Sequence, residues 1–158
     1  MRLCVTTAAM LLVGCAVFTH ASPMKVVATT SQLGVLAKEI GGSRVEPVVL
    51  IPAGSCPGHY ELRPGDVKAL MSGSGFVYHG WEGFAERLLH SANIVSARTC
   101  RIAISGSWLL PSIQIRAAET LCAFFCRLDG DHAVAYRKNL REFCRRMRLL
   151  EKELVAGK

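Results

Sequence analysis

The sequence contains few of the motifs that identify an enzyme. It has no HExxH motif, no nucleophile elbow and no pair of carboxylates at catalytic spacing. Cys122 and Cys126 lie four residues apart, but no second cysteine pair accompanies them, so the spacing of a zinc finger is absent as well. We therefore expect that the protein is neither an enzyme nor a zinc-finger protein.

The chain also lacks a clear nucleic-acid-binding pattern, although its formal net charge is +7 and its pI is about 9.3. No platform of arginines and aromatic residues occurs. Residues 116–158 hold ten Lys/Arg and six Asp/Glu, and the acids are interleaved with the bases at helical spacing. This pattern favours a solvated helix face over a nucleic-acid partner.

The apolar run near the N-terminus is too short for a membrane span. One basic residue, Arg2, precedes it, and the run ends at Phe18, which is typical of a secretory signal peptide over residues 1–21. The stretch Leu12–Cys15 (LVGC) resembles a bacterial lipobox, in which Cys15 would carry the lipid. Cleavage before Ser22 is the alternative. Either processing route predicts an exported protein, periplasmic or lipid-anchored on the outer side of the cytoplasmic membrane.

Export permits disulfides, but the cysteines are few and odd in number. Five follow Cys15: Cys56, Cys100, Cys122, Cys126 and Cys144. We interpret the pair at 122 and 126 as small core residues of a helix. A bridge between positions 56 and 100 stays open, because sequence alone does not show which cysteines pair.

Strand and helix patterns alternate along residues 25–110. Apolar, β-branched runs predict strands at 25–30, 45–51 and 75–80, with one or two short strands within 94–104. Amphipathic patterns predict three helices: one capped by Ser31 and ended by Gly41-Gly42, one that begins at Pro64 and ends before Gly73, and one within 82–93. The alternation predicts an α/β lobe whose mostly parallel, four-stranded sheet has helices on both faces.

Residues 111–158 form a predicted helical segment. A helix begins at Pro111, the run Asp129–Asp131 breaks it, and a long helix follows from about 131 to 155. Its apolar stripe recurs at steps of 4, 3, 4, 3 and 4: Tyr136, Leu140, Phe143, Met147, Leu150 and Leu154. This helix is longer than a lobe of this size needs, so we expect it to extend beyond the lobe.

Three polar or aromatic positions follow the predicted strands. His59 lies beyond the second strand, His79 ends the third, and Trp108 follows the fourth. Because the carboxyl ends of parallel strands meet at one edge, we expect these residues to converge there. Glu61 could orient the His59 ring by accepting its second N–H, as in metal sites. The alternative is that His59 is a polar loop residue and Glu61 a charge at a helix start.

Several segments together resemble a known family. They are VVATTS at the first strand, IGG at the first helix end, LIPAG before the turn, the His-aromatic-Glu triplet at 59–61, RPGDVKAL, and VYHG at 77–80. They resemble the N-terminal lobe of the zinc/manganese substrate-binding proteins of bacterial ABC importers. The final helix is similar to the long linking helix of that family, so the resemblance runs from Lys25 to Leu154.

The resemblance implies that His59 is a metal ligand. A second ligand His usually precedes a Trp in that family, but Gly106 stands at this position in ISGSWLLP, so the ligand is missing unless His79 replaces it. Cys56, in CPGH, becomes a neighbouring soft ligand, whereas Glu61 and Trp108 would support the site without binding the ion. Two ligands are fewer than a tight transition-metal site needs.

The resemblance also implies a membrane permease as partner and a second lobe, which supplies the remaining ligands in the family. This chain ends before such a lobe. We therefore expect a truncated protein that binds Zn or Mn weakly at an incomplete site. Two alternatives stay open: an exported lipoprotein that acts as an interaction or adhesin-like module without metal, and a hydrolase in which His59 and Glu61 act on a metal-bound water.

Overall fold

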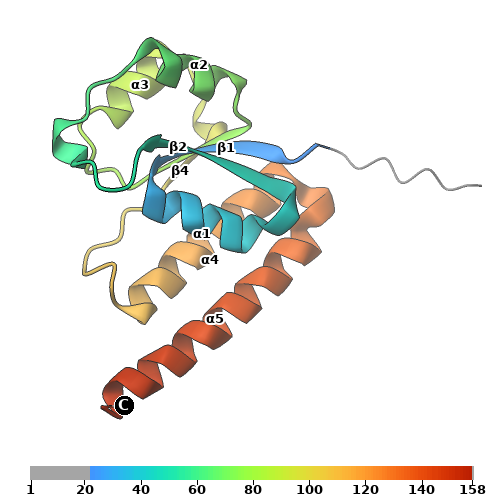
Figure 1. Ribbon diagram of the computed structural model, residues 1–158. Coiled ribbons are helices and arrows are strands. Elements are labelled where there is room, and N and C mark those ends of the chain that lie inside the picture. Colours follow the sequence, from blue (N-terminus) through green and yellow to red (C-terminus); the bar gives the residue numbers. More distant parts are fainter. Residues whose placement is uncertain (1–21, 158) are drawn as a thin grey trace, which may run out of the picture.

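The computed structural model describes residues 22–157 (Figure 1). The predicted signal peptide, lipobox and lipidated Cys15 lie outside the described residues. The elements are β1 (Met24–Thr30), α1 (Ser31–Gly41), η1 (Gly42–Arg44), β2 (Val45–Ile51), η2 (Pro57–His59), α2 (Pro64–Ser72), β3 (Gly75–Tyr78), α3 (Ala85–Ser91), η3 (Ser96–Arg98), β4 (Thr99–Arg101), α4 (Pro111–Leu128), η4 (Gly130–His132) and α5 (Ala133–Val155), where η denotes a short 3-10 helix.

The four strands form one sheet in the order β2-β1-β3-β4, and every neighbouring pair is parallel. The central strand β1 pairs on both sides, so that Val27 lies opposite Val48 on one side and Phe76 on the other. Its run of small and β-branched residues suits a strand that is buried on both faces. The predicted α/β fold with a four-stranded sheet is confirmed.

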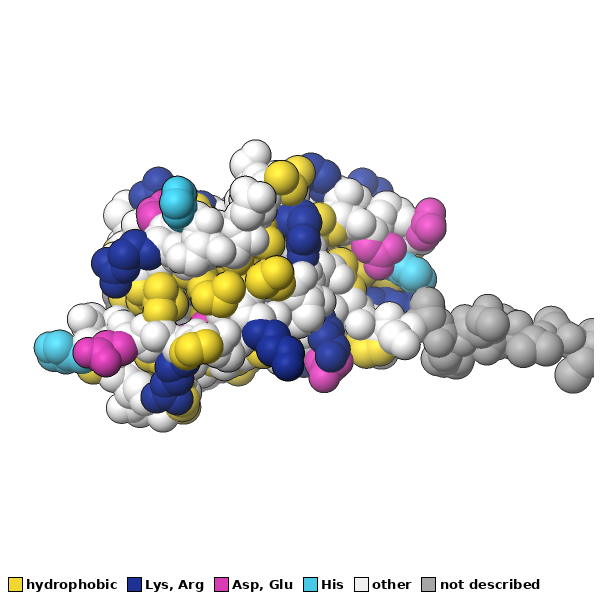
Figure 2. All heavy atoms as spheres, turned by 90° about the horizontal axis from the view of Figure 1, so that it is seen from above, with side chains coloured by type: hydrophobic (Ala, Val, Ile, Leu, Met, Phe, Trp, Pro, Cys, Tyr) yellow, Lys and Arg dark blue, Asp and Glu magenta, His cyan; other side chains and the backbone are white. Residues whose placement is uncertain are grey.

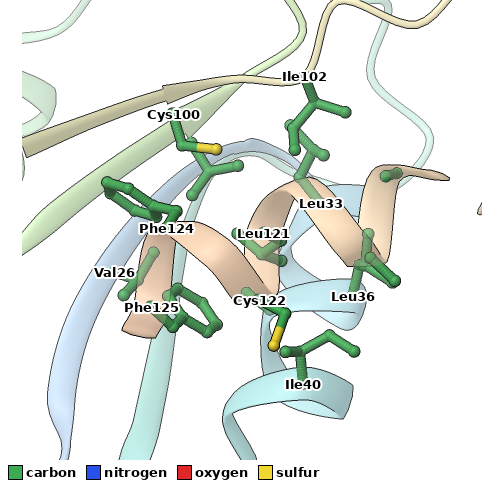
Figure 3. Packing of buried hydrophobic residues seen from close by; sticks show 14 of the residues in the cluster. Val26, Leu33, Leu36, Ile40, Cys100, Ile102, Leu121, Cys122, Phe124 and Phe125 are labelled. Atoms are coloured by element: carbon green, nitrogen blue, oxygen red, sulfur yellow. The ribbon is translucent and has the colours of Figure 1, made fainter. Parts of the chain in front are cut away.

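Each face of the sheet carries its own apolar core. On one face, alternate residues of β1 and β3, such as Val26 and Val77, pack against α1, α4 and α5. Figure 3 shows Phe124 and Phe125 of α4 and Ile40 of α1 in this core. On the other face the core is formed with α2 and α3. The helices therefore cover both faces, as expected, and the helical segment shares a core with the lobe.

The start of α1 differs from the prediction. Thr30 has extended backbone angles and caps the helix by accepting a hydrogen bond from the backbone N–H of Leu33, whereas Ser31 already lies in the first turn. The reason is that β1 pairs with β2 as far as Thr30, which is opposite Ile51. The cap is therefore the last residue of the strand, and its hydroxyl is brought to the edge of the sheet.

The long helix α5 leaves the lobe before it ends. Tyr136 and Phe143 of its apolar stripe are buried, but Leu150 and Leu154 are 41% and 59% exposed. Figure 1 shows the end of α5 projecting past the other elements. The expectation of a helix that extends beyond the lobe is confirmed. Within residues 22–157 no helix combines the length and the apolar composition required for crossing a membrane.

The five described cysteines are free thiols. Cys56 is exposed and Cys100 is buried, so the bridge left open between them is not formed. Cys122 lies in the core shown in Figure 3, which agrees with its interpretation as a small core residue. Burial raises the pKa of this thiol to about 11, so it is uncharged at neutral pH.

Candidate metal site

His79 lies at the carboxyl edge of the sheet, directly after β3, and its side chain is only 7% exposed. Its Nε2 atom and Thr30 Oγ1, at the end of the neighbouring strand β1, are joined by a hydrogen bond of 3.1 Å. Trp81 stacks on the ring with a centroid distance of 5.2 Å, and Trp108 meets it edge-on at the same distance. The predicted convergence of His79 with Trp108 is therefore observed.

A buried carboxylate holds this corner together. Glu82 is 4% exposed and accepts three hydrogen bonds: from the Thr29 hydroxyl at 2.5 Å, from the backbone N–H of His79 at 3.0 Å, and from that of Gly80 at 2.7 Å. It therefore ties the end of β1 to the loop after β3. Gly80 has φ +94°, a conformation that suits glycine and allows the loop to turn back onto the carboxylate.

The surroundings of His79 favour its neutral form. Burial lowers the pKa of the imidazole, and the nearby Glu82 carboxylate opposes this effect only in part. A neutral imidazole is the form that binds a metal ion. However, its Nε2 atom is already engaged with Thr30, so a metal at this atom would have to displace the hydroxyl.

His59 lies in very different surroundings. It ends the short helix η2 and is exposed. The turn is held by its neighbour Tyr60, whose hydroxyl donates to Asp66 Oδ2 at 2.9 Å and whose ring packs 5.1 Å from Phe84. Burial and the bond to Asp66 raise the pKa of Tyr60 to about 12. The aromatic residue thus anchors a turn that presents His59 to solvent.

Cys56 and Glu61 lie in the same turn as His59. All three line a cavity of about 480 Å³ formed by residues 55–63. Within residues 22–157, no hydrogen bond joins the Glu61 carboxylate to the His59 ring, so the expected orienting contact is not formed. The cavity nevertheless gathers a thiol, an imidazole and a carboxylate, which are the ligand types that zinc takes in proteins.

The turn and the His79 corner face each other across a second cavity. It measures about 210 Å³ and is lined by Pro57, Gly58 and Tyr60 from the turn, and by Trp81 and Glu82 from the corner. The two histidines therefore do not share a cavity: His59 lines the first, and His79 lines neither of these two. In the part of the chain that the structure describes, no group of three or more His, Cys, Asp or Glu side chains is placed to hold a metal ion.

The position at which the resemblance places a second ligand is occupied by Gly106. Its φ is +122°, which L-residues with side chains rarely adopt, and an added Cβ would lie 3.0 Å from Ile113 Cδ1. The backbone here is therefore shaped for glycine. A histidine at this position would therefore be strained unless the loop took another path.

Sequence reasoning missed Glu82, Thr30 and Trp81. Glu82 follows His79 by three residues at a loop-to-helix boundary, where a carboxylate usually reflects local capping. Its main partner, Thr29, lies 53 residues away in the chain, so no local pattern indicates the contact. The clearest sequence signal for this corner was the adjacent Trp81, a large aromatic residue in a glycine-containing loop. The structure shows that its side chain is 58% exposed.

Comparison with known proteins identifies the family. A family model described as "ZnuA: Zinc-uptake complex component A periplasmic" matches residues 26–157. The chain belongs to this family. The expectation that the protein belongs to an exported, metal-transport family is therefore confirmed, and the resemblance inferred from the sequence segments is correct.

Curated relatives of this ZnuA-family chain are longer than it is. The manganese-binding lipoprotein MntA of Bacillus subtilis is 31% identical over 147 residues, which cover 82% of this chain and 48% of that protein. The metal ABC transporter substrate-binding lipoprotein SsaB of Streptococcus sanguinis is 26% identical and covers 84% and 50%. The chain spans about half the length of the curated relatives it matches.

Solved structures agree on the fold. The Zn(II)-bound ZnuA-like domain of Streptococcus pneumoniae AdcA superposes with a TM-score of 0.77 at 20% identity, covering 85% of this chain and 55% of that one. At this identity the likeness concerns the fold alone.

Proposed function

We propose that the protein is an extracytoplasmic binding component of an ABC importer whose substrate is zinc or manganese. The family match over residues 26–157 carries this proposal, since it covers nearly all of the described chain. The relatives named above support both metals. The partner would be a membrane permease that receives the ion, and no chemical transformation of a substrate is involved, so the protein would not be an enzyme.

We propose His59 as the principal ligand, with Cys56 or His79 as the second. His59 and Cys56 are exposed and line one cavity, which supports the pair. His79 requires its bond to Thr30 to be exchanged for the metal. A thiolate ligand favours zinc over manganese. With two ligands from this chain, the remaining positions are open to water or to another protein surface, so binding is weak.

The proposal is tested by calorimetric titration of Zn²⁺ and Mn²⁺ into chelator-stripped protein. We expect weak Zn²⁺ binding that strengthens with rising pH, because the imidazole must be neutral and the thiol deprotonated. His59→Ala should remove it, and Trp108→Ala, a matched change at the same edge, should leave it largely intact. Nanomolar binding by a monomer, or binding unchanged in His59→Ala, would contradict this ligand set.

We further propose that residues 1–21 direct export and that Cys15 carries a lipid. The lipoprotein names of relatives such as MntA and SsaB support this. Mature protein should then begin at Cys15 and partition into detergent, and Cys15→Ser should abolish both. If the intact mass instead shows a mature chain that starts at Ser22 and carries no lipid, the lipidation proposal is wrong and ordinary signal-peptide cleavage takes place.

The organisation we propose is an N-terminal metal-binding lobe over residues 25–110 followed by a helical linking segment over 111–158. An interaction or adhesin-like module without metal transport is the second candidate. It is favoured by the exposed end of the apolar stripe on α5, at Leu150 and Leu154. A protein partner that binds equally well to wild type and to His59→Ala in the presence of chelator would support this candidate.

A further inference from the structure

The outward face of α5 carries a row of basic side chains. Lys138, Arg141, Arg145, Arg148 and Lys152 recur at steps of 3, 4, 3 and 4, and all five are exposed. The row begins two residues after the apolar stripe does and keeps the same period, so it lies about 200° around the helix from that stripe. The row therefore faces away from the lobe, along about 21 Å of helix.

The acidic residues of α5 do not interrupt this row. The helix holds seven Lys/Arg and three Glu, which are Glu142, Glu151 and Glu153. Helical geometry places each of them roughly 80–100° from the centre of the row. Glu142 pairs with Arg145 at 3.1 Å, but both side chains are more than half exposed, so the pair is weak. Acids that are interleaved along the sequence thus lie on the flanks of the folded helix.

Other basic residues are dispersed or already engaged. Arg98 and Arg101 donate to backbone carbonyls, and Arg146 pairs with Glu39 of α1. Figure 2, which shows the molecule from above, displays Lys and Arg side chains spread over this face, with acidic side chains beside several of them. The row on α5 is therefore a local concentration of positive charge and not only a reflection of the net charge of +7.

Two exposed apolar residues belong to the same outward half of α5. Val134 is 77% exposed and precedes Lys138 by four residues, and Leu149 is 49% exposed and follows Arg145 by four. A helix that combines a basic face with scattered apolar residues suits the interface of an anionic bilayer. The opposite side of the helix packs on the lobe as far as Met147, and the stripe extends beyond the lobe only at Leu150 and Leu154.

The start of the described chain lies beside the start of α5. Ser22, Pro23 and Met24 line a cavity of about 290 Å³ together with Asp129 and His132, which directly precede the helix. Six residues lie between Cys15 and Ser22, so these two positions can be at most about 25 Å apart. A lipid at Cys15 would therefore hold the beginning of α5 close to the membrane. This step rests on the proposed lipid anchor, but it does not depend on metal binding.

We propose that the basic row of α5, with Val134 and Leu149, is a docking surface for anionic phospholipid headgroups. A polybasic patch is a recognised membrane-binding signal that acts together with a lipid anchor. The surface would hold the protein flat on the outer face of the membrane that carries its permease. A second copy of the chain is a poor occupant, because two rows of like charge repel each other.

The test uses the full chain with Cys15→Ser throughout, so that no lipid is attached, and sucrose-loaded vesicles. Mixed phosphatidylglycerol and phosphatidylcholine vesicles are compared with pure phosphatidylcholine. The row variant carries Arg141→Gln, Arg145→Gln and Arg148→Gln. The control carries Arg63→Gln, Lys68→Gln and Arg87→Gln, which removes the same charge from exposed positions near α2 and α3. Circular dichroism establishes that both variants are folded.

We expect cosedimentation with the anionic vesicles that weakens as salt is raised, and a loss of about tenfold or more in the row variant alone. Equal losses in the two variants would overturn the proposal, since net charge would then explain binding. So would equal binding to neutral vesicles, or tighter binding to duplex DNA at the same salt concentration. Zn²⁺ titration of the row variant should match wild type, so that a failure here is separate from a failure of the metal site.

Discussion

The two histidines at the carboxyl edge of the sheet have opposite surroundings. His79 is buried, joined to Thr30, and enclosed between Trp81 and Trp108, with Glu82 fixing the loop behind it. His59 is exposed in a turn that is held by its neighbours and not by its own ring. One imidazole is already committed to protein contacts, and the other has its ring nitrogens available. Burial therefore separates a side chain that shapes the edge from one that can receive an ion.

The largest expected effect concerns the carboxylate behind His79. Glu82→Ala leaves the Thr29 hydroxyl and the amides of His79 and Gly80 without their acceptor, so we expect a loss of about 3 kcal/mol in the free energy of unfolding. Chemical denaturation measures it. Glu61→Ala, an exposed carboxylate in the His59 turn, is the matched control and should change stability by no more than about 0.5 kcal/mol. Equal effects would remove the contrast between the two regions.

A smaller effect is expected at the position where the family pattern places a ligand. Gly106→His forces a side chain into a left-handed conformation and against Ile113, at a cost of about 2 kcal/mol. The strain should prevent the new imidazole from completing the site. Thermal unfolding and Zn²⁺ titration of the same sample measure both consequences. Tight Zn²⁺ binding by Gly106→His would show that only the side chain, and not the path of the loop, departs from the family.

The next effect is the pH dependence of the free energy of unfolding that buried His79 causes. Because burial lowers the pKa of His79 in the folded protein, the unfolded chain binds the extra proton more readily, and stability should fall as pH drops below about 6.5. Above that pH, the contribution of neutral His79 to the free energy of unfolding is fully present. In chelator-treated protein, His79→Gln should flatten this slope, measured by denaturation from pH 5 to 8. An unchanged slope in His79→Gln would mean that another group causes it.

The smallest expected change in stability is at His59. His59→Ala removes an exposed ring that makes no hydrogen bond within residues 22–157, so unfolding should shift by no more than about 0.5 kcal/mol even though Zn²⁺ binding is lost. Thermal unfolding with and without Zn²⁺ separates the two readouts. A marked destabilisation of the metal-free variant would show that His59 is structural, and the comparison with His79 would fail.

Sequence patterns by themselves determined the elements of this protein and their layering. β-Branched runs located β1 and β2, Pro64 and Pro111 marked the first residues of α2 and α4, and the stripe from Tyr136 predicted α5. These features can be predicted from the sequence because each element has its own period. A strand places every second residue on one face, and a helix places residues three and four apart on one face. The turn at His59 was also predictable, because Pro fixes φ and Gly tolerates the backbone conformations that tight turns require.

Only the tertiary structure decided what surrounds each functional side chain. Thr29 meets Glu82 across 53 residues, and Thr30 meets His79 across 49, because parallel strands that are distant in sequence end at the same edge. The tertiary packing also turned the basic row of α5 outward, because Tyr136 and Phe143 on the opposite side of the helix are buried against the lobe. Local periodicity reflects the geometry of one element, whereas the environment of His59 and His79 depends on how several elements pack. That packing left one imidazole exposed and buried the other.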